Sequence, residues 1–116
     1  MLKSRINSFK YALSGLKTAI KDQPNFLIHC LFGSIAVLMG AFFNIDRAEW
    51  LVLFLTIGIV ITVELTNTAI EEVVNSFTDQ VHPAAKKAKD VAAGAVLVSS
   101  ISAIIIGLII FLPHLY

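Results

Sequence analysis

A carboxylate at the end of an apolar run constrains this chain more than any other feature. Glu64 ends a run that begins at Trp50. The helix that this run predicts continues through Asn67 and Glu71. Placing a carboxylate at bilayer depth costs about 2.5 to 3.5 kcal/mol even on a lenient insertion scale, so one found there indicates a functional site. At about 100° per residue, these three polar residues and Asn75 fall within roughly 80° of one helix face. The sequence therefore predicts a ladder of oxygen-bearing side chains that runs from inside a membrane towards water.

The composition explains why a membrane is the expected surrounding. Of the 116 residues, 57% are hydrophobic and 15% are charged, and the mean hydropathy is +0.82. A soluble domain of this size carries considerably more charge. We therefore expect an all-α integral membrane protein that forms a single domain over residues 1–116. Its single cysteine, Cys30, excludes an intrachain disulfide.

Three apolar segments are long enough to cross a bilayer. Residues 26–43 contain no lysine, arginine, aspartate or glutamate, residues 50–74 carry the polar ladder in their last third, and residues 91–112 are uncharged throughout. Because about 20 apolar residues span the hydrocarbon core, we expect three transmembrane helices. Small residues such as Gly33 and Ala95 recur at helical spacing in the first and third segments, which allows close helix packing.

Residues 1–22 are predicted to form an amphipathic helix on the membrane surface. Apolar residues recur there at spacings of three and four: Leu2, Ile6, Phe9, Leu13, Leu16 and Ile20. Basic residues lie between them. A basic amphipathic helix fits the surface of an anionic membrane, and Pro24 separates it from the first span. A short coiled-coil seam remains the alternative explanation of this spacing.

The basic residues are distributed asymmetrically along the chain. Eight of the nine lie before the first span or between the second and the third. The positive-inside rule then places the N-terminus and a loop over residues 76–90 in the cytoplasm, and Tyr116 outside. Glu71 is consequently expected near the cytoplasmic surface, with Glu64 about 10 Å deeper at 1.5 Å per residue.

This arrangement favours transfer of a phosphoryl group to a lipid hydroxyl. Glu64 is placed to take a proton from an alcohol. Glu71 lies where Mg²⁺ and phosphates arrive from water, and Mg²⁺ in such sites binds one or two protein carboxylates together with water and phosphate oxygens. Lys86, Lys87 and Lys89 in the predicted loop add positive charge beside it. Such a reaction depends mainly on positioning and electrostatics.

Each of these features also has a simpler explanation. Glu64 can be a structural hydrogen-bonding group, Glu71 can be an interfacial residue, and the lysines alone can be a topology signal. Glu72 points about 80° away from Glu64 and is expected to be a solvated side chain. Small multidrug transporters also place one essential carboxylate in a chain of this length, but they use four spans with the acid in the first.

Three sequence blocks carry a resemblance to a known family. They are ELTNTAIE at residues 64–71, HP at residues 82–83 and AKDVAAGAVL at residues 88–97. Over about residues 8–116 the chain resembles the small bacterial membrane lipid kinases, the prokaryotic diacylglycerol kinase and undecaprenol kinase family. The His-Pro pair and the IIFLP ending are more similar to the undecaprenol kinase branch.

The resemblance implies a homotrimer with active sites between protomers, located in the bacterial inner membrane with the N-terminus in the cytoplasm. It implies ATP and Mg²⁺ as the partners of a lipid alcohol, and no nucleic acid. Glu64 corresponds to the general base, Asn67 to the residue that orients the hydroxyl, and Glu71 and Gln23 to metal-binding positions. Nucleotide-binding positions fall on Tyr11, Gln23, Glu71, His82, Lys89 and Asp90. Lipid-binding positions fall on Ser8, Phe9, Ala12, Leu13 and Glu64.

Two positions depart from the family pattern. The family has carboxylates where this chain has Gln23 and Asn75. A neutral amide is a weaker Mg²⁺ ligand than a carboxylate, although Asp22 and Asp79 are acidic neighbours that can compensate. A catalytically inactive scaffold of the kinase fold is therefore an alternative to an active enzyme, whose lipid is expected to be undecaprenol or diacylglycerol.

Overall fold

The computed structural model describes residues 1–77 and 82–116 of the chain. These residues form the helices α1 (Leu2–Asp22), α2 (Pro24–Phe43), α3 (Arg47–Phe77) and α4 (Pro83–Phe111), followed by the 3-10 turn η1 (Leu112–His114). No strand occurs in either described range, so the prediction of an all-α protein is confirmed. The three helices that follow α1 are long and apolar enough to cross a membrane, as predicted.

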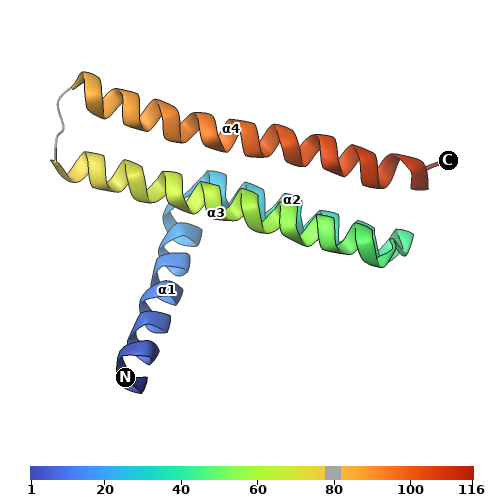
Figure 1. The fold of residues 1–116 in the computed structure, drawn as a ribbon, viewed down its shortest axis with the longest axis horizontal. Helices are drawn as coiled ribbons and strands as arrows, with labels where there is room; N and C mark the ends of the chain where they lie inside the picture. Colours follow the sequence, from blue (N-terminus) through green and yellow to red (C-terminus); the bar gives the residue numbers. More distant parts are fainter. Residues whose placement is uncertain (78–81) are drawn as a thin grey trace.

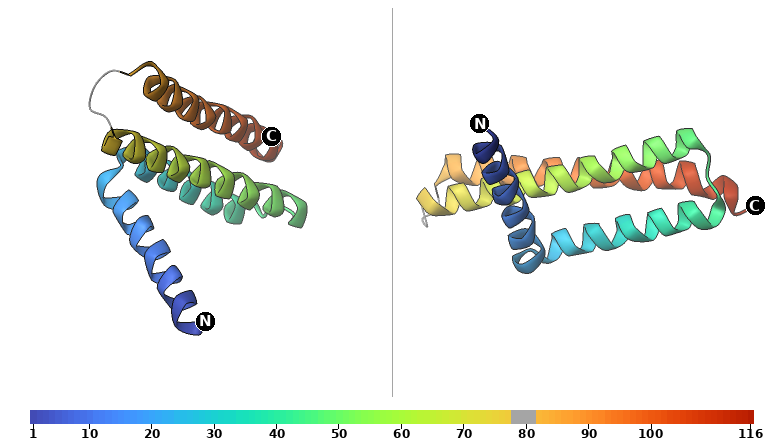
Figure 2. Two further views of the ribbon diagram at one scale, coloured as in Figure 1. Left: turned by 60° about the vertical axis from the view of Figure 1, so that its left-hand side comes forward. Right: turned by 90° about the horizontal axis from the view of Figure 1, so that it is seen from below.

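The helices α2, α3 and α4 run side by side, whereas α1 projects away from them (Figure 1). α3 packs against both α2 and α4. Both views in Figure 2 show α1 leaving the bundle steeply from the start of α2. Within α1 the one buried residue is Ala19, so the amphipathic helix covers little of its own chain.

The best-packed part of the bundle lies where α2 connects to α3. Ile45, Leu53, Ile110 and Phe111 are buried together at this end. The turn between the helices is made by Asn44, whose φ of 54° is left-handed. Asparagine adopts this conformation more readily than most residues because its short polar side chain bonds locally. This well-packed end fixes how α2 faces α3 along the rest of their length.

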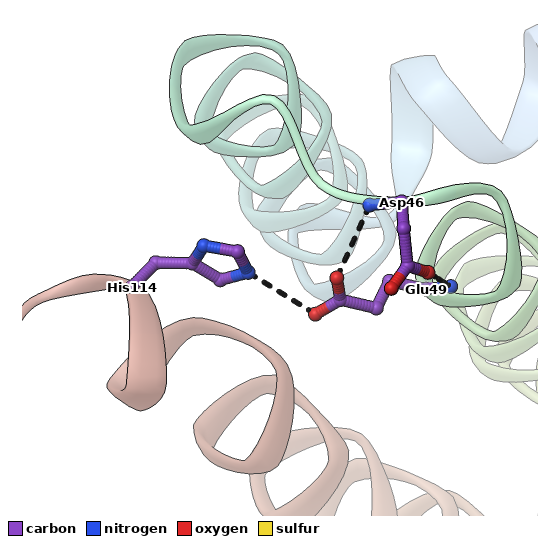
Figure 3. Close-up of polar contacts among 3 residues, drawn as sticks. All are labelled: Asp46, Glu49 and His114. Atoms are coloured by element: carbon purple, nitrogen blue, oxygen red, sulfur yellow. Dashed lines mark hydrogen bonds and ion pairs between the residues drawn. The ribbon is translucent and has the colours of Figure 1, made fainter.

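A polar cluster fixes the start of α3 (Figure 3). Asp46 Oδ1 accepts a hydrogen bond from the Glu49 backbone N–H at 2.8 Å, and Glu49 Oε1 accepts one from the Asp46 backbone N–H at 3.1 Å. This reciprocal capping box satisfies two N–H groups that a helix start leaves unpaired. The second carboxylate oxygen of Glu49 lies 3.2 Å from Nε2 of His114. The C-terminal turn is thereby tied to the start of α3.

Two glycines of α2 allow this helix to approach α3 closely. A Cβ at Gly40 would lie 2.8 Å from Cη2 of Trp50, and a Cβ at Gly33 would lie 3.2 Å from Cγ2 of Ile57. Real Cβ atoms rarely tolerate such short contacts in a close-packed interior. The prediction that small residues of the first span serve close packing is confirmed at these two positions.

α3 and α4 are longer than the spans predicted from hydropathy. α3 begins at Arg47 rather than at residue 50 and ends at Phe77 rather than at residue 74, and α4 begins at Pro83 rather than at residue 91. The prediction of a loop over residues 76–90 is therefore wrong at both of its ends. Hydropathy detects the part of a helix that matches the hydrocarbon, whereas the helix itself continues into water. Asp79 lies outside the described residues.

α3 is longer than α2 and extends past its start. The 20 residues of α2 span about 30 Å, which matches the hydrocarbon core. The 31 residues of α3 span about 46 Å and exceed it. Figure 1 shows α3 and α4 extending past the start of α2. We call the part of α3 and α4 that extends past the start of α2, and that contains Asn75 and Lys89, the overhang.

Candidate functional site

Glu64 is the one buried charged side chain in residues 1–77 and 82–116, with 3% of its surface exposed. Its Oε2 lies 3.5 Å from Nε2 of His29 on α2. His29 follows Pro24, the first residue of α2, by about 8 Å along the helix axis at 1.5 Å per residue. Because the length of α2 matches the thickness of the hydrocarbon core, we expect the pair to lie about 8 Å inside the edge of that core.

One turn further along α3, Asn67 and Glu71 interact. Asn67 Nδ2 donates a hydrogen bond to Glu71 Oε1 at 3.3 Å. Asn67 Oδ1 is buried and has no hydrogen-bond partner in the described part of the chain. Leaving a buried acceptor unpaired costs about 1 to 3 kcal/mol, so such an atom indicates a place for a ligand. A hydroxyl hydrogen or a cation fits this oxygen.

Within the overhang, a lysine of α4 contacts α3. Nζ of Lys89 donates to Oδ1 of Asn75 at 3.0 Å. Because this acceptor is a neutral amide, the contact does not neutralise the positive charge of the ammonium. On the same helix, Asp90 forms an exposed ion pair with Lys86. The prediction that these basic residues lie in a loop is wrong, since α4 contains them.

His82 has a structural role at the start of α4. Its Nδ1 accepts a hydrogen bond from the backbone N–H of Ala84 at 3.2 Å. The side chain therefore acts as the N-cap, and Pro83 follows it in the first helical position, where a missing N–H is harmless. This cap explains the His-Pro pair without reference to a nucleotide.

The ladder on α3 forms as the sequence predicts. Glu64, Asn67 and Glu71 belong to one continuous helix, and the Asn67–Glu71 hydrogen bond shows that neighbouring rungs touch. Asn75 extends the row to α4 through Lys89. Glu72 is exposed, as expected from its position outside the ladder face.

The predicted residues of α1 and its junction do not meet the ladder within one chain. Gln23 is half-buried between α1 and α2, where its backbone N–H bonds to Ala19 and its carbonyl accepts from Phe26. In the described residues no hydrogen bond or ion pair joins its side chain to Glu71. The remaining α1 positions are exposed on a helix that projects from the bundle: Ser8, Phe9, Tyr11, Ala12 and Leu13.

Hard oxygen ligands for Mg²⁺ are present on α3. Glu71 and the unpaired Oδ1 of Asn67 lie one turn apart. No cluster of three or more His, Cys, Asp or Glu side chains able to hold an ion occurs within the described ranges. Mg²⁺ normally takes one or two protein ligands and completes its shell with water and phosphates. The residues therefore fit an ion that arrives on a nucleotide rather than one enclosed by protein.

Sequence reasoning missed His29 as the partner of Glu64. An ionisable residue within an apolar span is a signal in itself, because such residues pair inside the membrane. The sequence does not specify which faces of two helices meet. The structure was therefore needed to identify the pair.

An apolar groove with a volume of about 400 Å³ lies beside the pair. It is formed by α2, α3 and α4, and His29 is its one ionisable lining residue. Phe32 and Gly33 line it on α2, Val60 on α3 and Ile104 on α4. The groove brings a hydrocarbon-compatible surface to the buried carboxylate.

These features define a membrane protein with three apolar helices, a buried carboxylate on the second of them, and a row of polar side chains that ends beside a lysine. The chain matches the family model described as prokaryotic diacylglycerol kinase over residues 10–111 and belongs to this family. Membership confirms the predicted lipid kinase activity, a phosphotransferase reaction that uses ATP. It favours neither the transporter nor the inactive scaffold.

Individual relatives support the same family. The chain is 43% identical over 108 residues to an undecaprenol kinase of Bacillus subtilis (strain 168), which covers 93% of this chain and 88% of that protein. It is 41% identical over 109 residues to a diacylglycerol kinase of Synechocystis, covering 93% of this chain and 62% of that protein. It is 28% identical over 109 residues to a diacylglycerol kinase of Escherichia coli (strain K12), covering 94% and 89% of the two chains.

Proposed function

We propose that this chain transfers the γ-phosphoryl group of ATP to the primary hydroxyl of undecaprenol in the bacterial inner membrane. The observation that carries this proposal is the burial of Glu64 at 3% exposure, with a polar ladder from it towards water. A lipid hydroxyl lies close to the headgroup level, whereas ATP stays in water, so the two substrates can meet only at this edge. The 43% identity to an undecaprenol kinase supports a polyprenol as the acceptor.

In this proposal, Glu64 acts as the general base. The hydroxyl oxygen attacks the γ-phosphorus, the bond from that phosphorus to the bridging oxygen of ADP breaks, and the hydroxyl proton passes to the Glu64 carboxylate. Asn67 uses one N–H for Glu71. An amide nitrogen has two N–H donors, so the second holds the hydroxyl oxygen in line for attack.

The nucleotide lies along the overhang in the proposed complex. Glu71, Asn67 Oδ1 and Gln23 would hold Mg²⁺, which neutralises phosphate charge when it is bound. Lys89 adds a positive charge whose present partner, Asn75, is neutral. The remaining proposed nucleotide contacts are Tyr11, His82 and Asp90.

We propose that the active unit is a homotrimer with its sites between protomers. α1 projects from its own bundle. A second copy can therefore bring its α1 residues to the ladder of the first, whereas within one chain the two lie apart. The lipid would then contact exposed positions of α1: Ser8, Phe9, Ala12 and Leu13. The basic residues of α1 and α4 support a cytoplasmic N-terminus.

The test is transfer of radiolabelled phosphate from ATP to pure undecaprenol or diacylglycerol in detergent micelles. We expect undecaprenol to give the higher kcat/KM. Glu64→Gln keeps the shape but removes the base, so turnover should fall on the order of a hundredfold while ATP binding persists. Glu72→Gln removes an exposed carboxylate off the ladder and should leave turnover unchanged. Near-normal turnover in Glu64→Gln would refute the role of the base, and a higher kcat/KM for diacylglycerol would assign the other lipid.

A further inference from the structure

We propose that His29 is a positioning residue for the base. Its Nε2, acting as an N–H donor, holds Oε2 of Glu64 and leaves Oε1 as the atom that takes the hydroxyl proton. The inference rests on the proposed role of Glu64. It adds a residue of α2 to the proposed site.

Burial makes a partner for Glu64 necessary. A carboxylate at 3% exposure has lost nearly all contact with solvent, and a buried charge without a partner is strongly unfavourable. Among the described residues, His29 is the one side chain within ion-pair distance, with 3.5 Å between Nε2 and Oε2. No hydrogen bond in the described structure engages Oε1. The one polar side-chain contact to the carboxylate in the described structure therefore comes from α2.

The location of His29 matches this role better than a purely structural one. Its side chain is 21% exposed, compared with 4% for that of Glu64. The exposed part lines the apolar groove. A lipid tail entering the groove would bring its hydroxyl to the side of the pair where imidazole and carboxylate meet. A donor that fixes one carboxylate oxygen keeps the other within the roughly 0.5 Å tolerance that productive geometry demands.

The packing of α2 on α3 holds the imidazole in place. Gly33, one turn after His29 on α2, brings the helix so close that a Cβ there would lie 3.2 Å from Ile57. A side chain on a packed helix is positioned more accurately than one on a loop. Sliding α2 by one residue, about 1.5 Å, would break the contact.

His29→Leu tests the proposal, since it removes the N–H and replaces the imidazole with an apolar side chain that still fills the groove. We expect kcat to fall about tenfold or more, with the KM for ATP unchanged, because the carboxylate is misplaced while the nucleotide site is intact. His29→Gln restores an N–H donor of similar reach and should recover most of the lost kcat. If His29→Leu does not accumulate as a folded protein, His29→Met tests the same loss.

Leu31→Ala is the matched control. Leu31 lies two residues after His29 on α2, is exposed and does not line the groove, so its replacement shortens a side chain of the same helix without removing a donor near Glu64. We expect its kcat to equal that of the wild type. Equal losses in His29→Leu, His29→Gln and Leu31→Ala would mean that His29 has no specific effect on the base, and would overturn the proposal.

A double variant separates this inference from the proposed function. Adding His29→Leu to Glu64→Gln should cause no further loss of turnover, because the donor then has no base to position. A further tenfold loss would show that His29 acts independently of Glu64. An inactive Glu64→Gln together with a fully active His29→Leu would refute the inference alone. A fully active Glu64→Gln would refute the proposed base.

Discussion

Replacing Gly40 with alanine should weaken the joint between α2 and α3. The added Cβ would lie 2.8 Å from Cη2 and 3.1 Å from Cζ3 of Trp50, and 3.0 Å from Cδ1 of Ile45. The Trp50 ring cannot yield freely because it stacks on Phe54 with centroids 5.3 Å apart. Overpacking of this kind costs about 1 to 3 kcal/mol, whereas alanine gains about 1 kcal/mol of helix propensity over glycine. We therefore expect the free energy of unfolding to fall by up to about 2 kcal/mol.

Gly58→Ala is the matched control for this prediction. A Cβ at Gly58 meets no atom within 4 Å, so that variant should show the propensity gain alone. The two variants should then differ by about 1 to 3 kcal/mol in the free energy of unfolding. Unfolding in mixed micelles with increasing denaturing detergent can be followed by the fluorescence of Trp50, the single tryptophan of the chain. Equal stability of the two variants would show that the helix backbones do not approach each other at Gly40.

Two further predictions concern the metal and the nucleotide. Gln23→Glu adds a negative charge opposite the proposed Mg²⁺ and should lower the Mg²⁺ concentration for half-maximal turnover, whereas Asn25→Asp should not; an unchanged midpoint in Gln23→Glu removes Gln23 from the metal site. Asn75→Leu removes the acceptor that lies 3.0 Å from Lys89. Because hydrogen bonds to exposed charged groups contribute roughly 0.5 to 1 kcal/mol, the KM for ATP should rise about two- to fivefold with kcat unchanged. Steady-state kinetics at varied ATP measures this, and a wild-type KM would show that Asn75 does not hold Lys89 for the nucleotide.

The features that depend on local periodicity could be predicted from the sequence. A segment of uncharged residues such as 26–43 has few options other than a membrane helix, since every backbone polar group must be satisfied within the segment. Once residues 64–75 are helical, the period of 3.6 residues per turn places Glu64, Asn67 and Glu71 on one face. The hydrogen bond of 3.3 Å between Asn67 and Glu71 agrees with this phase.

Helix ends and contacts between helices could not be predicted in the same way. The start of α3 is set by the capping box of Asp46 and Glu49, a short polar motif that hydropathy does not detect. The pairing of His29 with Glu64 depends on the rotation and offset of α2 against α3, which no local pattern contains. The relation of α1 to the ladder is also a tertiary property, because α1 projects away from its own bundle.

Because the length of α2 matches the thickness of the hydrocarbon core, we expect bilayer thickness to affect the rate of the proposed reaction. α2 has 20 residues and crosses about 30 Å, whereas α3 has 31 residues and, at about 46 Å, is longer than the hydrocarbon core. Membranes differ in thickness by a few ångströms, and a helix adapts to this by tilting at a small cost in energy. A shift of that size is comparable to the roughly 3 Å between a donor and its acceptor. With Glu64 as the proposed base, we therefore expect the acyl-chain length of the surrounding lipids to change the rate through the depth of Glu64, without any lipid binding as an effector.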